Sequence, residues 1–379
     1  MAQLRRIMSR AWRVQLREQE PLFTAERPAR GACVSFWGRF FVPLCANGDN
    51  IVQWASDVTL PGLQSRTQPE SNQGGVAVEN FIATLAYLLI GMGLRRMPNF
   101  HRDTGAVLNA FVIHISLPAM VLLKVPQLSF SSDLLILALT PWGMLAVSWV
   151  LVVAAARLFA WDRPTVGCLL LLAPLANTSF FGVPMVRAFF GDHAIPYALF
   201  YDQFGSFLAL STYGSLVLAL YGTGGVKPTI RAVAKKIVVF PPFLALLCAL
   251  ALHGVDCPPL LKPLLETLAA TLVPVVMIAV GFQLTLRLNR AVLGQLSVGL
   301  LIKLVCAPLA ALLACRLLGL EGETVRVACL EAGMPPMVAA GALAIMANLS
   351  PPLAAAMVGV GVLLSFVTLP LLYQLGQLL

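Results

Sequence analysis

The sequence predicts an all-helical protein that crosses a membrane many times. Of its 379 residues, 59% are hydrophobic and 11% are charged, whereas an average soluble domain has about 45–50% apolar and 25% charged residues. The mean hydropathy is +0.84, and the chain repeats apolar runs near the roughly 20 residues that a helix needs to cross a bilayer. Soluble enzymes and nucleic-acid-binding proteins are therefore disfavoured. The net charge of +9 is expected to reflect Lys and Arg in cytoplasmic loops.

Residues 1–75 differ in composition from the rest of the chain. They contain nine Arg and six acidic residues but no run that can span a membrane, and they end in the polar segment Gln68–Gly75. This composition predicts a disordered extension. Hydrophobic order begins abruptly at Val76, so we expect translation to start near Val76 or Val78. Native peptides from Met1–Arg66, detected by mass spectrometry, would contradict that expectation.

The remaining residues predict ten membrane-spanning helices in two halves. A basic loop, residues 222–236, separates a first repeat, residues 76–221, from a second repeat, residues 237–379. Each half has five apolar segments, and an odd number gives the halves opposite topology, as in inverted-repeat transporters. The expected segments are 79–95, 105–125, 133–158, 165–188, 194–221, 237–253, 260–285, 292–316, 325–347 and 352–376.

The loops indicate how the helices are oriented. Alternate loops carry eleven Lys and Arg on one side and five on the other. Cytoplasmic loops are enriched in these residues, so the basic loop is predicted to be cytoplasmic and both ends of the ten-helix core to be outside. We expect a multi-pass protein of the bacterial inner membrane.

The fourth and ninth segments are predicted to be broken helices. The fourth contains Leu172–Pro184, with two prolines, a glycine and three polar side chains. Pro184 is expected to free backbone carbonyls near residue 180, because proline has no N–H and its ring clashes with the preceding turn. The ninth contains Glu331–Pro336. Two half-helix N-termini near the midplane attract an anion, whereas the alternative is a pair of ordinary kinked helices.

The two halves carry traces of a duplication. Leu117-Pro118 and Val273-Pro274 lie 156 residues apart, and the same offset relates Glu331–Pro336 to Leu175–Phe180. The offset thus places the two predicted breaks at corresponding positions, which points to a transport site.

Several motifs resemble the auxin efflux carrier family, which includes bacterial malonate-type permeases. The strongest is Asn177–Pro184, followed by Phe190-Gly191 and Tyr201–Gln203. Further similarities are Leu108-Asn109, Leu117-Pro118, Pro274, Gly281, Leu284, Lys303, Pro308 and Met334–Pro336. The resemblance covers essentially all of residues 76–379. It implies ten helices in two inverted repeats, with a scaffold domain and a transport domain whose fourth and ninth helices unwind and cross at proline.

The resemblance also implies a substrate site at the crossing. By position, Asn177 and Pro184 would border the substrate in the first crossover, and Pro335 or Pro336 in the second. The family motif includes Gln203. The complete predicted set is Asn177, Thr178, Ser179, Gly182, Pro184, Gln203, Met334, Pro335 and Pro336. The central loop is much shorter than in plant members, which favours a small carboxylate over a plant hormone.

Four ionisable residues inside apolar segments are candidates for ion coupling, because such groups are costly in a membrane unless paired or hydrated. Glu331 accepts a proton, helps to hold a cation, or caps a half-helix. Asp202 reaches the crossover cavity or lies near the membrane surface. His114 takes part in proton coupling or packs as a hydrogen-bonded residue. Lys303 balances Glu331, attracts an anion, or extends to the interface.

We therefore expect a secondary transporter that moves a small organic anion by alternating access. Its coupling ion would be a proton or sodium, and no other cofactor or metal site is expected. Expected partners are the anion and membrane lipid, with a homodimer as one assembly to consider and no nucleic acid.

The alternatives are a sodium-coupled symporter of the bile-acid type and a membrane receptor. The former carries Glu-x-Gly-x-Gln-Asn in its ninth helix, but here Glu331-Ala332-Gly333-Met334 is followed by Pro335-Pro336. An enzyme is not expected, because the sequence has no HExxH motif, nucleophile elbow or clustered carboxylates with metal spacing.

Overall fold

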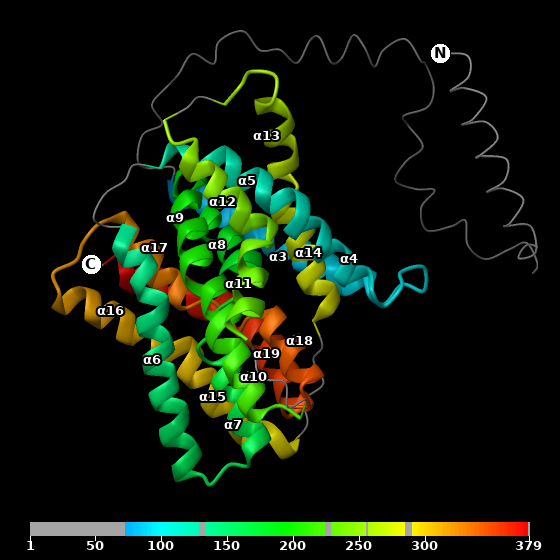
Figure 1. Ribbon diagram of the computed structural model, residues 1–379, viewed down its shortest axis with the longest axis vertical. Coiled ribbons are helices and arrows are strands. Elements are labelled where there is room, and N and C mark those ends of the chain that lie inside the picture. Colours follow the sequence, from blue (N-terminus) through cyan, green and yellow to red (C-terminus); the bar gives the residue numbers. More distant parts are fainter. Residues whose placement is uncertain (1–72, 129–133, 224–228, 255–256, 285–289, 378–379) are drawn as a thin grey trace, which may run out of the picture. The chain divides into compact units, whose positions relative to one another are not determined.

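The computed structural model describes residues 73–128, 134–223, 229–254, 257–284 and 290–377 (Figure 1). These residues form helices, with no β-strand among them apart from one isolated bridge. Almost all of the predicted N-terminal extension lies outside the described residues. Six described helical stretches are long and apolar enough to cross a membrane: Thr104–Gln127, Leu134–Leu158, Asp192–Tyr221, Lys262–Gln283, Arg290–Leu317 and Pro351–Gly376.

Helices are also found within the other predicted apolar segments, but these are short, bent or interrupted. Glu79–Leu94 and Arg163–Leu172 are shorter apolar helices, and Ile230–Val238 with Pro241–Ala251 makes a seventh span if the bent pair counts as one. The structure therefore confirms an all-helical membrane protein. The arrangement of ten spans in two inverted repeats stays a prediction.

The helices keep the labels of Figure 1. Up to residue 223 they are α3 (Gln73–Leu94), α4 (Thr104–Phe111), α5 (Leu117–Lys124), α6 (Leu134–Leu158), α7 (Arg163–Leu172), α8 (Val183–Phe190), α9 (Ile195–Tyr201) and α10 (Ser215–Tyr221). From residue 229 they are α11 (Ile230–Val238), α12 (Pro241–Ala251), α13 (Lys262–Ala270), α14 (Leu272–Gln283), α15 (Leu293–Leu301), α16 (Ala307–Leu317), α17 (Glu323–Ala332), α18 (Val338–Met346) and α19 (Pro351–Gly376).

Several helices contain π-helical or 3₁₀ turns. The π-helical turns are η3 (Val112–Ser116), η5 (Thr178–Gly182), η7 (Asp202–Phe207), η8 (Leu210–Gly214) and η10 (Ile302–Cys306). The 3₁₀ turns are η4 (Val125–Gln127), η6 (Asp192–Ala194) and η9 (Arg290–Val292). π-helical turns are rare overall, but those that occur are often found at functional sites. Three of the four ionisable candidates, His114, Asp202 and Lys303, lie within such turns.

The basic segment predicted as a loop is partly helical. Helix α11 begins at Ile230, and the hydroxyl of Thr229 accepts a hydrogen bond from the Ala232 N–H at its start. Apolar residues recur at helical spacing between basic ones, which makes the helix amphipathic, and none of its residues is buried. The helix then bends by 65° into α12. This surface helix therefore carries Arg231, Lys235 and Lys236 of the basic segment.

Helices α3 and α14 pack against each other (Figure 1), and their backbones approach very closely. A Cβ atom added at Gly91 would lie 2.1 Å from the Ile278 carbonyl oxygen, and one added at Gly281 would lie 2.1 Å from the Leu88 carbonyl oxygen. Small residues let membrane helices approach backbone to backbone. This crossing therefore depends on glycine on both helices.

Contacts between connecting segments divide them into two groups. In the first group, Arg95 donates to the Leu284 carbonyl, Arg163 to the Leu220 carbonyl, and the Thr223 N–H to the Ala347 carbonyl at 3.3 Å. These residues lie at the helix ends that were predicted to be cytoplasmic.

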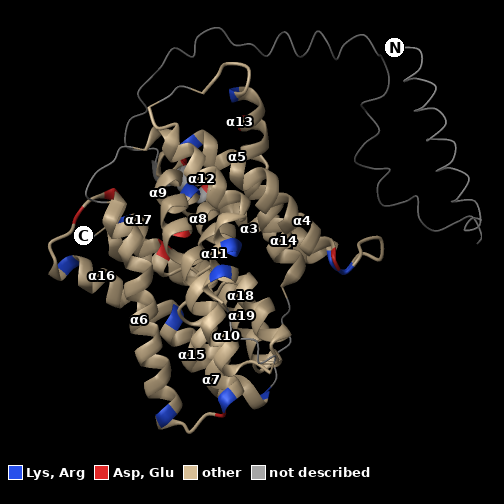
Figure 2. Ribbon diagram, viewed as in Figure 1, with Lys and Arg blue, Asp and Glu red and all other residues tan. Residues whose placement is uncertain are grey.

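The second group links helix ends predicted to be outside. The Nε2 atom of His193 lies 3.0 Å from the Glu323 carboxylate, and Arg326 donates to the Gln377 side chain at 3.0 Å. Most charged positions lie at helix ends and in connections (Figure 2). The contacts therefore agree with the predicted alternation of the helices.

Candidate functional site

Two helices are interrupted inside the protein, and the interruptions meet. After α7 ends, residues 173–177 are not helical until η5 begins, and η5 continues into α8. After α17 ends, residues 333–337 are not helical until α18 begins. The break predicted at Pro335-Pro336 is confirmed by these helix bounds.

The two unwound segments pair with each other. Ala176 and Pro336 form an antiparallel bridge. The Asn177 N–H donates to the Pro335 carbonyl at 2.9 Å, and the Met337 N–H donates to the Leu175 carbonyl at 3.0 Å. Buried backbone N–H and C=O groups need hydrogen-bond partners. Each unwound segment therefore provides partners for some of the backbone groups that the other leaves without a helical hydrogen bond.

The pairing corrects the predicted register between the halves. Ala176 and Pro336 are 160 positions apart in the chain, and the same offset relates the first residues of α7 and α17. The offset of 156 derived from Leu117-Pro118 and Val273-Pro274 is therefore wrong by four residues at the crossing, because connecting segments differ in length between the halves.

The first break lies in the N-terminal part of the predicted segment Leu172–Pro184. It falls at residues 173–177, which include Pro174, and the chain is helical again through Pro184. Pro184 is the second residue of α8 and follows the π-helical turn η5. Pro184 has no N–H to donate to the preceding turn, which is the π-helical turn η5, and the chain stays helical through it. The interruption therefore lies at residues 173–177 rather than at Pro184.

A cavity of about 160 Å³ lies at the N-terminal ends of the two half-helices that follow the breaks. Asn177, Ser179 and Phe180 line it at the start of η5, and Met337 and Ala339 line it at the start of α18. The first N–H groups of a helix have no partner within that helix, and the helix dipole gives this end a partial positive charge. Both half-helices therefore direct positive potential into one cavity.

Other helices complete the cavity. Asp202 and Lys236 are its ionisable lining residues, and Lys236 is exposed. The remaining lining is apolar: Ile113, Leu117, Phe207, Leu210 and Phe240. Phe207 and Phe240 stack with ring centroids 4.1 Å apart. The site thus combines a polar end at the crossing with an apolar wall.

Asp202 is held in a buried hydrogen-bond network at this polar end. The Thr178 hydroxyl donates to Asp202 Oδ1 at 2.5 Å, and Gln203 Nε2 donates to Asp202 Oδ2 at 2.7 Å. Thr178, Asp202 and Gln203 are all buried. Among the described side chains, the Asn177 amide nitrogen and the Gln203 amide oxygen are buried without a hydrogen-bond partner. Asn177 lines the cavity, so its amide nitrogen is available to a ligand there.

Glu331 lies against the first crossover from the last turn of α17. Its side chain is fully buried. A Cβ atom added at Gly182 would lie 2.3 Å from Glu331 Oε2 and 2.7 Å from Oε1, so the carboxylate touches the Gly182 backbone and leaves room only for glycine. Within the part of the chain that the structure describes, both Glu331 oxygens have no hydrogen-bond partner.

Lys303 lies on the opposite side of the crossing. It is 1% exposed, so it does not extend to the membrane interface as the alternative interpretation proposed. Its ammonium group is 3.5 Å from the Ala332 carbonyl oxygen at the end of α17. A charge on Lys303 attracts the Glu331 carboxylate, whereas Glu331 and Asp202 are both acidic and repel each other when both are charged. The structure thus brings three of the four coupling candidates to the crossing.

The fourth candidate, His114, is elsewhere. Its side chain is exposed, and its Nδ1 atom lies 2.8 Å from the Ala110 carbonyl oxygen of its own helix. Of the predicted binding residues, two line the cavity, Asn177 and Ser179. The others are buried around the crossing without lining it: Thr178, Gly182, Pro184, Gln203, Met334, Pro335 and Pro336. Thr178 and Gln203 donate to Asp202, and the rest shape the backbone there.

Sequence reasoning missed Lys236 and the stacked pair Phe207 and Phe240. Lys236 was counted only as a loop charge, although the helical spacing of apolar residues in 230–238 indicates an amphipathic helix. The aromatic pair joins residues on either side of the basic segment, and no local pattern predicts such a contact.

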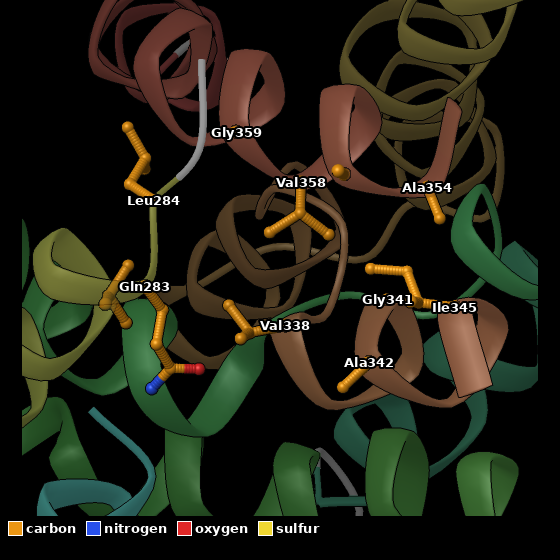
Figure 3. A pocket seen from close by; sticks show the side chains of 11 residues that line it. Gln283, Leu284, Val338, Gly341, Ala342, Ile345, Ala354, Val358 and Gly359 are labelled. Atoms are coloured by element: carbon orange, nitrogen blue, oxygen red, sulfur yellow. The ribbon is translucent and has the colours of Figure 1, made fainter. Parts of the chain in front are cut away.

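A second cavity, of about 130 Å³, lies on another side of α18 (Figure 3). Val338 and Ala342 of α18 face Val358 of α19 across it. At the end of α14, the Gln283 side chain lines it and donates to the Gly105 carbonyl at 2.9 Å. The half-helix α18 is therefore flanked by space on two sides.

Comparison with known proteins places this architecture among membrane transporters. Residues 76–373 match the model of a family described as "Membrane transport protein". An uncharacterized transporter of Methanothermobacter thermautotrophicus is 27% identical over 304 residues, which cover 78% of this chain and 97% of the relative. An uncharacterized transporter of Methanocaldococcus jannaschii is 23% identical over 269 residues, which cover 69% of this chain and 86% of the relative.

Proposed function

Because the chain belongs to the membrane transport protein family, the family of the auxin efflux carriers, we propose that it moves a small organic anion across the membrane by alternating access. Membership makes it a multi-pass membrane transporter, which agrees with its apolar helices. The printed names of its relatives give no substrate, so the substrate class rests on the site.

One observation carries the proposal of an anion. The cavity lies where two half-helix N-termini converge, and the buried Asn177 amide nitrogen beside them has no hydrogen-bond partner among the described residues. An amide nitrogen only donates hydrogen bonds, and unpaired helix N–H groups do the same. A carboxylate satisfies all of these donors together, whereas a cation satisfies none.

The apolar wall favours a carboxylate with an apolar body. Phe180, Phe207 and Phe240 line the cavity together with aliphatic residues. A dicarboxylate such as malonate would place its second charge against this wall, where the exposed Lys236 is the one basic residue among the described lining residues. A second charge away from Lys236 would be buried without a partner, which is costly. We therefore expect monocarboxylates to be transported better than dicarboxylates of similar size.

We propose that ten helices in two inverted repeats form this site. The equal lengths of α7 and α17 and the antiparallel pairing of the two breaks support that arrangement. In the usual design of such transporters, one bundle moves against the other around a site at their interface.

In this chain the moving part would be the bundle that contains the crossing, and the glycine-dependent crossing of α3 and α14 would belong to the scaffold. The cavity is lined from both parts, by Asn177 and Met337 of the crossing and by Ile113 and Leu117 of the helix that continues α4. Space on two sides of α18 gives this half-helix room to shift.

We propose a proton as the coupling ion and Asp202 as the group that carries it. Asp202 lines the cavity, so its negative charge repels an anionic substrate nearby. A proton on this carboxyl group removes that repulsion. The neighbouring ionisable groups are Tyr201 beside it in the chain, Glu331 from α17 and Lys236 on the cavity wall.

A sodium-coupled symporter of the bile-acid type is the second candidate, because Glu331 stands at the position of that family's ninth-helix Glu. Pro335 and Pro336, which replace its Gln-Asn pair, lie in the paired unwound segment and have no side-chain amide to offer a cation. A receptor would not require two paired breaks. The bacterial inner membrane and the homodimer stay predictions.

Uptake into proteoliposomes tests the proposal. The purified full-length protein would be assayed with radiolabelled indole-3-acetate, malonate, malate and succinate, with and without an imposed proton or sodium gradient. We expect saturable uptake of an acid. Asn177→Ala should weaken it by about 10- to 100-fold, since a hydrogen bond to a charged group contributes roughly 1.5–3 kcal/mol.

Asn99→Ala is the matched control, because Asn99 is exposed in a connecting segment, and it should leave uptake unchanged. Wild-type uptake rates in a folded Asn177→Ala protein would refute the site. Folded wild-type protein that takes up none of the acids under any gradient would refute the substrate class.

A further inference from the structure

A small cavity lies at the C-terminal ends of the half-helices that precede the breaks. Its volume is about 10 Å³, and Pro174, Leu175 and Ala176 line it after α7, with Ala332 at the end of α17. The last four carbonyl groups of a helix have no partner within that helix, and the helix dipole places about half a negative charge at this end. Two such ends therefore concentrate negative potential at one point.

Lys303 lies at this cavity. It lines the cavity together with Tyr201 and Ser206, and its ammonium group is 3.5 Å from the Ala332 carbonyl oxygen. Among the described residues, Lys303 is the one Lys or Arg with a buried side chain. The Lys303 side chain thus lies at the end of α17 and beside the residues that follow α7.

In transporters with interrupted helices, unwound carbonyls and half-helix C-termini commonly coordinate the coupling cation. We infer that Lys303 is a built-in substitute for that cation, so the protein needs no bound sodium, and removal of Lys303 exposes a site for a monovalent cation. An ammonium group carries the same charge and donates to the same carbonyl oxygens. The cavity beside it has room for about one water molecule, which leaves no space for a second cation.

This inference rests on the proposed function, because a coupling cation has a role only in a protein that transports a substrate. It accounts for the buried Glu331 carboxylate, which has an electrostatic partner in Lys303 on η10 without a bound ion. It also decides against the sodium-coupled alternative.

Sodium binding to the purified full-length protein tests the inference without any measurement of uptake. The thermal unfolding midpoint would be measured in sodium chloride and in choline chloride at equal ionic strength, together with equilibrium binding of ²²Na⁺. The wild-type midpoint should be the same in both salts, with no saturable ²²Na⁺ binding. Lys303→Ala should lower the midpoint in choline and recover several degrees in sodium, because a ligand of the folded state stabilises it.

Three variants make the test specific. Lys303→Gln also removes the ammonium group but keeps a polar side chain, and its unfolding midpoint should also rise in sodium. Lys303→Arg keeps the positive charge and should not respond. Lys262→Ala removes an exposed lysine and should behave as wild type.

Glu331→Gln combined with Lys303→Ala should lose the sodium response, since it removes the carboxylate beside the exposed site. Saturable sodium binding by the wild-type or Lys303→Arg protein would overturn the inference, and both of these proteins keep a basic side chain at position 303. A folded Lys303→Ala or Lys303→Gln protein without a sodium response would also overturn it. Failure of the transport proposal would instead appear as absent uptake by the wild-type protein.

Discussion

At the scale of single residues, the acidic Asp202 and the basic Lys303 lie at different ends of the interrupted helices. Asp202 lines the cavity at the half-helix N-termini, and its carboxylate accepts hydrogen bonds from Thr178 and Gln203. Lys303 occupies the C-terminal ends. Glu331 lies in the last turn of α17, where Lys303 attracts its carboxylate and the like charge of Asp202 repels it. Buried charges are tolerated when they are paired or hydrogen-bonded: Asp202 accepts two hydrogen bonds, whereas neither Glu331 oxygen has a hydrogen-bond partner among the described residues.

The role of Asp202 can be separated from a structural role with a nearly isosteric variant. Asp202→Asn keeps an oxygen that accepts from Thr178 but carries no charge and takes up no proton. We expect the variant to lose the stimulation of substrate uptake by a proton gradient, while exchange of labelled for unlabelled substrate continues. Uptake into proteoliposomes with and without the gradient measures both.

Asp192→Asn is the matched control, because Asp192 is exposed and pairs with Arg187 at 2.7 Å. It should retain the full response to the gradient. If Asp202→Asn responds to a proton gradient as strongly as the wild type, Asp202 does not carry the proton.

At the scale of helices, the sequence was informative about which helices break and less so about where. Consecutive Pro335 and Pro336 determine the second break, since neither can continue the helix. In the first half Pro174 and Pro184 are both present, and the choice between them depends on which segment pairs with residues 333–337. That pairing is a long-range contact, as are the approach of Glu331 to Gly182 and the position of Lys303, and local patterns carry no information about them.

The glycine crossing of α3 and α14 provides a test at this scale. Gly91→Ala would bring a methyl group into contact with the Ile278 carbonyl, at 2.1 Å if nothing moved. The backbones must then separate, and overpacking of this kind costs about 1–3 kcal/mol. We expect a lower thermal unfolding midpoint for the purified variant in detergent.

Gly93→Ala is the control in the same helix, because a Cβ atom at Gly93 meets nothing within 4 Å. It should leave the midpoint unchanged or raise it, since alanine favours a helix over glycine by up to about 1 kcal/mol. Equal midpoints for the Gly91→Ala and wild-type proteins would mean that the crossing is not close-packed in the membrane protein.

At the scale of the whole chain, the proposed function requires that corresponding helices of the two halves run in opposite directions through the membrane. The contacts of Arg95 with Leu284 and of Thr223 with Ala347 join helix ends on one predicted side, and that of His193 with Glu323 joins ends on the other. The Lys and Arg distribution then assigns the first side to the cytoplasm. The contacts thus predict which helix ends share a side of the membrane, and the charges predict which side is cytoplasmic.

Labelling of single cysteines determines this sidedness. In a protein whose native cysteines are replaced, Asp192→Cys and Glu321→Cys should react with a membrane-impermeant thiol reagent on intact cells. Asp103→Cys and Asp162→Cys should react only after the membrane is permeabilised. All four positions are exposed in the structure, so differences in reactivity report the side of the membrane. If the two pairs reacted from the reversed sides, the helices would alternate as predicted but in the opposite orientation. Reaction of all four from one side would refute the opposite topology of the two halves, and with it the inverted-repeat mechanism of transport.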